Sequence, residues 1–282
     1  NVLRDIISSG IIKVVYLTEI FRQAQESMIV LNAHRINQGH MPYLNIKGGD
    51  FFFDKREKPD VILDTMFDLI CRRLPGFGSY DPMKDMQVLS PMRKGAIGVN
   101  NLNVELQRIL NPPSGQKREK TLRGILFREG DKVMQIKNNY RTTWKRKMGG
   151  FVIEEGEGVF NGDIGYVQSI DHEEQSVVVL FDDDREVELD FSQLDELELA
   201  YAISVHKSQG SEFPVVIIPL AWGPPMLMTR NLLYTAVTRA REMVTIVGRE
   251  RVIEAMVRNN YIEKRYSGLA HRFKKVFVAL NF

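Results

Sequence analysis

An eight-residue run of uninterrupted apolar residues constrains the fold of this chain most. The run Phe213–Leu220 contains no polar side chain. A strand of this kind is buried on both faces, which requires a sheet covered by helices from both sides. Other strand-like runs occur at residues 11–17, 86–89, 200–205 and 243–247, and helical patterns at residues 18–24, 27–37, 59–74, 99–110, 229–241 and 250–259. This alternation predicts an α/β fold with a mostly parallel sheet.

The middle of the chain has a different texture. Short strand-like runs follow one another at residues 132–136, 165–170, 177–181 and 185–189, with turn signals at residues 161–163 and 182–184. Several short strands without helices predict a small antiparallel barrel inserted in the α/β fold. We therefore expect three segments: residues 1–137, an inserted barrel at 138–197, and a return to the α/β fold at 198–282.

The stretch between residues 144 and 158 is rich in glycine and charge, and we expect it to be a mobile loop. Trp144 precedes three basic residues, Lys145, Arg146 and Lys147. This arrangement could stack on a nucleic-acid base, or it could belong to a solvated loop.

Charge is distributed unevenly along the chain. The formal net charge is +2, but residues 171–200 hold twelve acids and one base, so that segment carries −11 and the remainder +13. A basic body of this size can hold a polyanion, although scattered lysines and arginines also occur on ordinary solvated surfaces. We do not expect the acidic segment to contact nucleic acid.

Cysteine and histidine usage points away from disulfides and metal sites. Cys71 is the sole cysteine, which rules out an internal disulfide and fits a reducing cytoplasm. We expect its side chain in the core. The five histidines show no metal-ligand spacing, so no metal site is predicted. No run approaches the roughly 18 apolar residues that a membrane span needs.

A polar loop between two apolar strands is the first candidate site. Residues 204–213 read Ser-Val-His-Lys-Ser-Gln-Gly-Ser-Glu-Phe. Hydroxyls and backbone N–H groups suit phosphate oxygens, and Gly210 allows a close approach of the backbone. The alternative is a polar connection built from ordinary turn residues.

Arginines near two helical patterns form the second candidate. Residues 232–241 give a helix with an apolar side, and Arg239 and Arg241, two positions apart, would point to different faces. One could face a partner domain. A helical arginine is otherwise usually a surface residue or an ion-pair partner, and the same alternative applies to Arg22 and Gln23.

Taken in order, these stretches resemble the conserved motifs of superfamily 1 helicases, in particular the RecD-like branch that includes the α subunit of exodeoxyribonuclease V. Residues 17–23 resemble motif IV, residues 204–213 motif V and residues 233–241 motif VI. Residues 87–91 with Gly98 are similar to a DNA-contacting segment, and residues 160–165 to the start of the family's inserted Src-homology-3-type barrel. The resemblance implies a RecA-like fold carrying that barrel, in a family that acts in DNA repair and recombination.

The resemblance also implies roles for particular residues. Arg22 and Arg239 would reach the γ-phosphate of ATP, while Gln23, Gly210 and Glu212 would contact the nucleotide, Glu212 at its ribose. The single-stranded DNA track would be lined by Ser204, His206, Lys207, Ser208 and Gln209, with Ser90 and Arg93 opposite. ATP and Mg²⁺ are the implied cofactors. The implied partners are single-stranded DNA, a preceding RecA-like domain of the same polypeptide and subunits of a nuclease complex, with no membrane involved.

One motif of such a motor is missing from the sequence. No G-x-x-x-x-G-K-[ST] phosphate loop occurs, and the chain begins at Asn1 without methionine. We therefore expect the C-terminal half of a longer helicase, inactive in ATP hydrolysis alone, with 5′-to-3′ polarity implied by the resemblance. Two alternatives stay open: the helicase portion of a conjugative relaxase, and a nucleic-acid or protein interaction module without a motor role.

Overall fold

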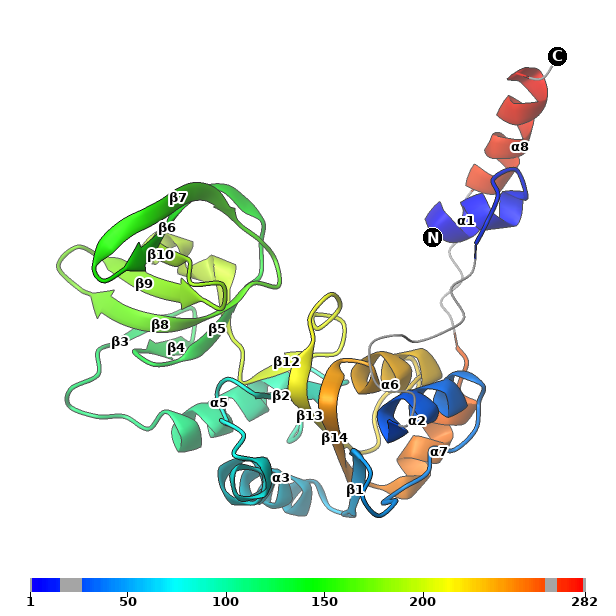
Figure 1. Cartoon of the computed structure of the whole chain (residues 1–282), viewed down its shortest axis with the longest axis horizontal. Coiled ribbons are helices and arrows are strands. Elements are labelled where there is room, and N and C mark those ends of the chain that lie inside the picture. The colour runs from blue at the N-terminus through cyan, green and yellow to red at the C-terminus, as the bar shows by residue number, and fades with distance from the viewer. Residues whose placement is uncertain (1, 16–26, 262–267, 281–282) are drawn as a thin grey trace.

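The computed structural model describes residues 2–15, 27–261 and 268–280. Figure 1 shows an α/β part built on a parallel sheet, and beside it a curled antiparallel sheet formed by the middle of the chain. This arrangement confirms the predicted α/β fold with an inserted barrel. The antiparallel sheet extends beyond residues 138–197, because it also contains β5, which precedes them, and β11, which starts at Leu197 and ends at Leu199.

The parallel sheet has five strands in the order β1-β14-β13-β2-β12, and every neighbouring pair is parallel. Their bounds are β1 Phe51–Lys55, β2 Met86–Ser90, β12 Ala202–Ser204, β13 Phe213–Leu220 and β14 Ala240–Gly248. Strand β13 lies at the centre, with Val215 and Ile217 in one hydrophobic cluster and Val216 and Ile218 in the other. The central apolar run is therefore buried from both sides, as its composition predicts.

Helices cover both faces of this sheet. On one face lie α2 (Met28–Asn37), α6 (Arg230–Val237) and α7 (Glu250–Arg258); on the other lie α3 (Pro59–Asp68) and α5 (Val99–Leu110). Helix α3 continues through a π-helical turn, Leu69–Arg73, into α4 (Leu74–Gly78). Helix α1 (Val2–Ser9) contacts α8 (Leu269–Leu280), and this pair projects away from the sheet (Figure 1).

The antiparallel sheet has seven strands in the order β11-β5-β8-β9-β10-β6-β7. Their bounds are β5 Lys132–Gln135, β6 Asn139–Met148, β7 Phe151–Val159, β8 Ile164–Asp171, β9 Ser176–Phe181, β10 Glu186–Asp190 and β11 Leu197–Leu199. A separate hairpin, β3 (Glu119–Leu122) with β4 (Ile125–Arg128), precedes them, and a 3₁₀ helix (Phe191–Glu196) leads into β11.

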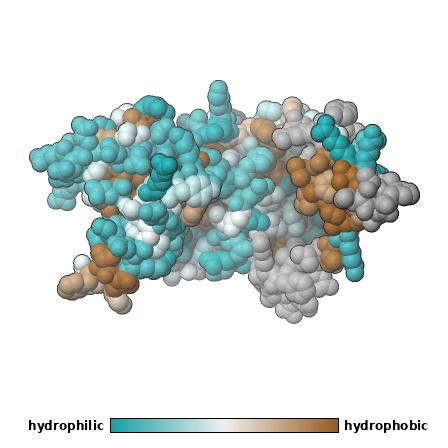
Figure 2. Space-filling view, turned by 90° about the horizontal axis from the view of Figure 1, so that it is seen from above, coloured by the Kyte–Doolittle hydropathy of each residue, from teal (hydrophilic) through white to brown (hydrophobic). Residues whose placement is uncertain are grey.

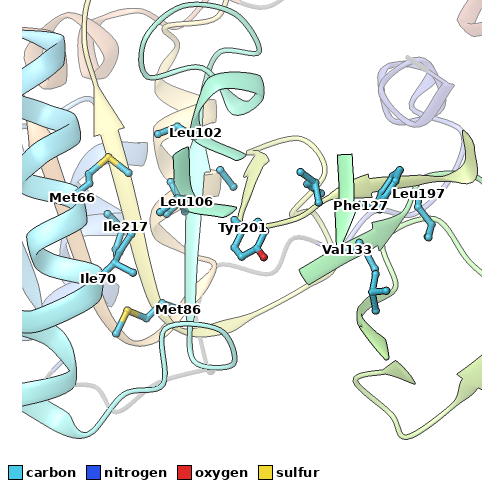
Figure 3. Close-up of a cluster of buried hydrophobic side chains, with 14 of the residues drawn as sticks. Met66, Ile70, Met86, Leu102, Leu106, Phe127, Val133, Leu197, Tyr201 and Ile217 are labelled. Atoms are coloured by element: carbon cyan, nitrogen blue, oxygen red, sulfur yellow. The ribbon is translucent and has the colours of Figure 1, made fainter. Parts of the chain in front are cut away.

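One hydrophobic cluster runs through both parts of the molecule. Figure 3 shows this cluster extending from Ile217 in the α/β part, through Leu106 and Tyr201, to Phe127 and Val133 on the barrel side. Hydrogen bonds reinforce the junction, because the Asn103 amide on α5 donates to the carbonyl oxygens of Leu199 and Ala202 at 3.0 and 2.9 Å. The barrel is therefore packed against the α/β part and is not merely tethered to it.

Several predictions about local structure are wrong. Residues 11–15 form no strand, and Ile12 and Val15 are exposed. The edge of the parallel sheet is formed by β1 instead. Residues 16–24 lie outside the described residues.

The helix expected to stop near Pro75 continues to Gly78, because the π-helical turn precedes the proline and Pro75 lies in the first turn of α4.

The stretch 144–158 is a hairpin and not a mobile loop. Strands β6 and β7 pair across a Gly149-Gly150 tip, where both glycines have positive φ angles of 58° and 86°. Such angles suit a tight hairpin turn. Trp144 packs on Gly156, where an added Cβ would lie 2.5 Å from the indole, so the ring belongs to the barrel packing and base stacking is not supported.

Cys71 is exposed rather than buried. It lies in the π-helical turn, where the extra residue per turn shifts the direction of side chains relative to an α-helix.

The surface seen in Figure 2 is largely hydrophilic, with hydrophobic side chains gathered mainly towards the two ends of the long axis. At the barrel's β6–β7 tip the exposed apolar residues are Met148, Phe151, Val152 and Ile153. Within the described ranges, none of the helices combines the length and apolar character that crossing a bilayer requires.

A buried lysine at the junction makes the free energy of unfolding depend on pH in the alkaline range. Lys132 on β5 is 3% exposed, and its Nζ donates to the Met86 carbonyl at 3.2 Å. Burial lowers the pKa of its ammonium from 10.5 to about 8, although Asp182, Asp81 and Asp85 act in the opposite direction. Because the unfolded chain keeps its proton up to a higher pH, the free energy of unfolding should rise between about pH 8 and 10.5.

The test compares wild type with Lys132→Met across that range. We expect the difference in unfolding free energy between the two proteins to change by roughly 3 kcal/mol, in favour of wild type as pH rises. Chemical denaturation at several pH values measures it, and taking the difference cancels tyrosines that titrate nearby. A difference that stays flat from pH 8 to 10.5 would contradict the assignment.

Candidate nucleic-acid and nucleotide site

Two polar segments begin side by side at the carboxyl edge of the parallel sheet. Ser90 ends β2 and Ser204 ends β12, and the two residues are register partners. The Val205 amide donates to the Ser90 carbonyl at 3.3 Å, which carries the pairing one residue further. Residues 91–98 and 205–212 therefore leave the sheet together, at the edge where parallel sheets commonly bind ligands.

The loop after β12 is held by its own backbone. The amides of Lys207 and Ser208 donate to the Ser204 carbonyl at 2.9 and 3.2 Å. Gly210 has φ +95°, which a side chain would strain. The side chains of His206 and Gln209 are exposed, and that of Ser204 is half-buried.

The side chains of Ser90 and Ser208 are buried beneath the two loops and hydrogen-bond to their backbone. Both are fully buried, and their hydroxyls donate to the carbonyl oxygens of Ile97 and Val205, each at 2.8 Å. Their hydroxyls are therefore committed to shaping the two segments. The expectation that they line a DNA track directly finds no support in this geometry.

Two cations from the two segments meet at one carboxylate. Nη2 of Arg93 lies 3.0 Å from Oε1 of Glu198, and Nζ of Lys207 lies 2.7 Å from Oε2. Burial acts to raise the pKa of Glu198, but the hydrogen bond and charge of Lys207, together with Arg93, outweigh it and lower that pKa below its usual value. The carboxylate is therefore ionised at neutral pH.

Glu198 is a residue that sequence reasoning missed. It lies on β11, in the acidic segment that we did not expect to contact nucleic acid. No motif or spacing in the sequence indicates a role for Glu198, since its partners Lys207 and Arg93 are nine and 105 residues away.

Arg239 lies beyond the end of α6, in the turn that leads into β14. The predicted helix thus ends four residues early, because β14 begins at Ala240 and pairs with β13 there. Its guanidinium donates from Nε to the Thr235 carbonyl at 3.2 Å and from Nη1 to the Ser211 carbonyl at 3.1 Å. These bonds fix the orientation of the guanidinium on the backbone at Ser211, one residue before Glu212, whose side chain is exposed.

The remaining predicted residues are separated from this group or fall outside it. Arg241 is exposed on β14. Arg22 and Gln23 lie outside the described residues. The structure thus brings together Arg93 and Lys207 at Glu198, and Arg239 with the backbone of Ser211, as two separate clusters.

The loop 205–212 connects these two clusters. Ser204, the last residue of β12, lies level with Ser90 at the end of β2. Val215 on β13 pairs with Met86 at the start of β2, so Phe213, the first residue of β13, lies two residues before that level. At about 3.3 Å per residue, the two ends differ by roughly 20 Å along the strand direction. One short segment therefore spans the distance between the two clusters.

A parallel sheet with helices on both faces and an inserted antiparallel barrel is the architecture that the resemblance to superfamily 1 helicases implies. Residues 102–181 match the family described as the ATP-dependent RecD-like DNA helicase SH3 domain, and residues 199–247 match the UvrD-like helicase C-terminal domain. Together with the 35% identity to a RecD-type helicase over 80% of this chain, these matches show that the chain belongs to the RecD-like superfamily 1 helicases, which confirms the resemblance.

Individual relatives agree with the family matches. The chain is 35% identical over 227 residues to the ATP-dependent RecD2 DNA helicase of Deinococcus radiodurans, covering 80% of this chain and 27% of that protein. It is 28% identical over 192 residues to the RecBCD enzyme subunit RecD of Mycolicibacterium smegmatis, covering 68% of this chain and 30% of that protein. The chain thus spans less than a third of the length of either relative.

Among solved structures, a Pif1 helicase from Bacteroides in complex with ADP-AlF3 and single-stranded DNA aligns with 94% of this chain and 57% of its own. The sequence identity is 18% and the TM-score 0.47. No residue correspondence follows from an alignment this distant.

Proposed function

We propose that this chain is the C-terminal motor region of an ATP-dependent DNA helicase of the RecD-like type. The observation that carries the proposal is the loop 205–212. At one end it presents Lys207, which shares Glu198 with Arg93, and at the other end its Ser211 carbonyl accepts a hydrogen bond from Arg239. A segment that touches both a cationic surface and an oriented arginine can couple strand binding to phosphoryl transfer.

The cationic end fits the backbone of single-stranded DNA. Arg93 and Lys207 offer charge, while exposed His206 and Gln209 and half-buried Ser204 offer further polar groups. These groups suit phosphate and sugar rather than base edges, so binding should tolerate any sequence.

The arginine end fits a nucleotide triphosphate held chiefly by another domain. The Arg239 guanidinium is half-buried and oriented by carbonyl oxygens, which is the preorganised state that charge stabilisation needs. Glu212, which the family resemblance assigns to the ribose, is exposed, and in this proposal it accepts a hydrogen bond from the ribose hydroxyls. Bound ATP with Mg²⁺ would supply the hydrolysis energy, and a preceding RecA-like domain carrying the missing phosphate loop would hold it. Arg22 and Gln23 complete this proposed set.

The name of the mycobacterial relative, a RecBCD enzyme subunit, extends the proposal to assembly with nuclease subunits. The 5′-to-3′ polarity rests on the family resemblance. Residues 138–197 form the proposed barrel insertion, between α/β segments 1–137 and 198–282.

Binding of single-stranded DNA by this chain should weaken steeply with salt. Each phosphate neutralised contributes a slope of about −0.7 to the dependence of log affinity on log salt. We expect a slope of about −1.5 to −3 for a fluorescein-labelled oligonucleotide titrated from 50 to 200 mM salt, with equal affinity for oligonucleotides of different sequence. Lys207→Ala should make the slope shallower by about 0.7.

Lys55→Ala is the matched control. Lys55 also pairs with one glutamate, Glu250 at 3.9 Å, but it lies on β1, at the opposite edge of the sheet from β12. Its loss should leave the slope unchanged. Binding that ignores salt or prefers particular bases would contradict the proposed backbone track and would favour a different interaction module.

A further inference from the structure

Glu198 bridges the two cations of the proposed DNA track from outside the segments that carry them. It lies on β11 of the barrel sheet, whereas Arg93 follows β2 and Lys207 follows β12 of the parallel sheet. Its two oxygens are used separately, one for each cation, at 3.0 and 2.7 Å. The geometry is that of an anion captured between two positive groups.

The cations of this cluster are accessible enough for a phosphate to replace the glutamate as their partner. Glu198 and Lys207 keep about a quarter of their side-chain surface exposed, at 25% and 26%, while Arg93 keeps 59%. Solvent, and therefore a phosphate, can reach the cations without unfolding the loop. Two cations and one carboxylate leave a net charge of +1, half of what the cations would present without the glutamate.

We propose that Glu198 acts as an internal competitor for the DNA phosphate, occupying both track cations and thereby weakening the grip of the track on the strand. This inference rests on the proposed function. A motor that steps along DNA must release each phosphate it binds, and a carboxylate that returns to Arg93 and Lys207 favours release. The barrel thus contributes to DNA binding through an acid that sets the strength of the track.

The test is the affinity of this chain for single-stranded DNA after Glu198→Gln. Glutamine keeps the size and a hydrogen-bond acceptor but removes the charge. We expect about 5-fold tighter binding at 50 mM salt, with a slope of log affinity against log salt steeper by about 0.7, which corresponds to one additional phosphate contact. The gain should shrink as salt rises, because screening weakens the added attraction.

Asp195→Asn is the matched control. Asp195 also bridges two cations, Lys137 at 2.9 Å and Arg123 at 3.3 Å, and the substitution changes the net charge equally. Neither of its partners lies in the two polar loops. Glu198→Asp, which keeps the charge, should stay near wild type in affinity.

A second measurement separates competition from a structural role. In a chain that already carries Arg93→Ala and Lys207→Ala, the Glu198→Gln change should have no effect on affinity, because the two cations that Glu198 occupies are gone. Thermal unfolding of each variant checks that the fold is kept.

The possible failures are distinguishable. If wild type does not bind single-stranded DNA at all, the proposed function fails and this inference fails with it. If wild type binds but Glu198→Gln binds equally or more weakly, or if Asp195→Asn tightens binding as much, the competitor role is overturned while the proposed function stands.

Discussion

Replacing Arg239 with alanine should reduce DNA-stimulated ATP turnover by about 10³-fold or more, the range that arginine fingers contribute in other nucleotidases. The guanidinium is oriented by the carbonyl oxygens of Thr235 and Ser211, so it can stabilise developing charge without reorganising. The measurement needs a polypeptide in which a phosphate-loop domain precedes this chain. The loss should appear in kcat, with the KM for ATP changed only a few-fold, because the contact strengthens in the transition state.

Arg241→Ala provides the control for this experiment. Arg241 is two residues away but exposed on β14. Its removal should leave turnover within about two-fold of wild type. Arg239→Lys should recover little activity, since a lysine keeps the charge but not the planar fork of donors. Unchanged turnover in Arg239→Ala would return this residue to a structural role in the turn before β14.

Asp131→Ala should lower the free energy of unfolding by roughly 3–5 kcal/mol, a large part of the stability of a typical domain. The carboxylate is fully buried between β4 and β5 and accepts four hydrogen bonds. The donors are Asn111 Nδ2 (2.7 Å), Tyr201 Oη (2.8 Å), Gln107 Nε2 (2.6 Å) and the Arg128 amide (2.7 Å).

The size of this effect follows from what alanine leaves behind. The Tyr201 hydroxyl and the Arg128 amide would be buried without an acceptor, and a cavity would open beside them. Burial raises the pKa of the Asp131 carboxyl even though all four hydrogen bonds act to lower it, which shows how strongly the site is desolvated.

Denaturant unfolding of the isolated chain measures the loss. Glu188→Ala, which removes an exposed carboxylate from β10, should change stability by less than about 0.5 kcal/mol. A loss below about 1 kcal/mol for Asp131→Ala would mean that the barrel and the α/β part are less tightly joined at this point than the hydrogen bonds indicate.

Local sequence patterns correctly predicted those helices and strands whose burial pattern is evident from their own residues. The helix at residues 99–110 and the strand at residues 213–220 match α5 and β13, because an amphipathic period and an uninterrupted apolar run each define one burial pattern. Residues 11–15 show the limit of this reasoning. Their apolar, β-branched character suits a strand, but a strand needs a neighbour, and the sheet edge is occupied by β1.

The β6–β7 hairpin was missed for a different reason. Its strands carry charges on many positions, which resembles a loop when hydrophobicity alone is considered. The charges pair within the barrel, with Arg146 and Glu154 at 2.6 Å across the hairpin and Lys147 bonded to Glu186 of β10. Ion pairs across strands depend on register, which the composition of one strand does not reveal.

The sequence by itself determined the α/β class, the inserted barrel, the RecD-like resemblance and the polar loop at residues 204–213, because each is carried by residues close together in the chain. The tertiary structure alone decided that Ser90 and Ser208 face inward, that Asp131 joins α5 to the barrel, and that Glu198 holds Arg93 and Lys207. These contacts join residues up to about a hundred positions apart. A hydrogen bond or ion pair depends on distances that only the packed chain sets, so no local pattern could predict them.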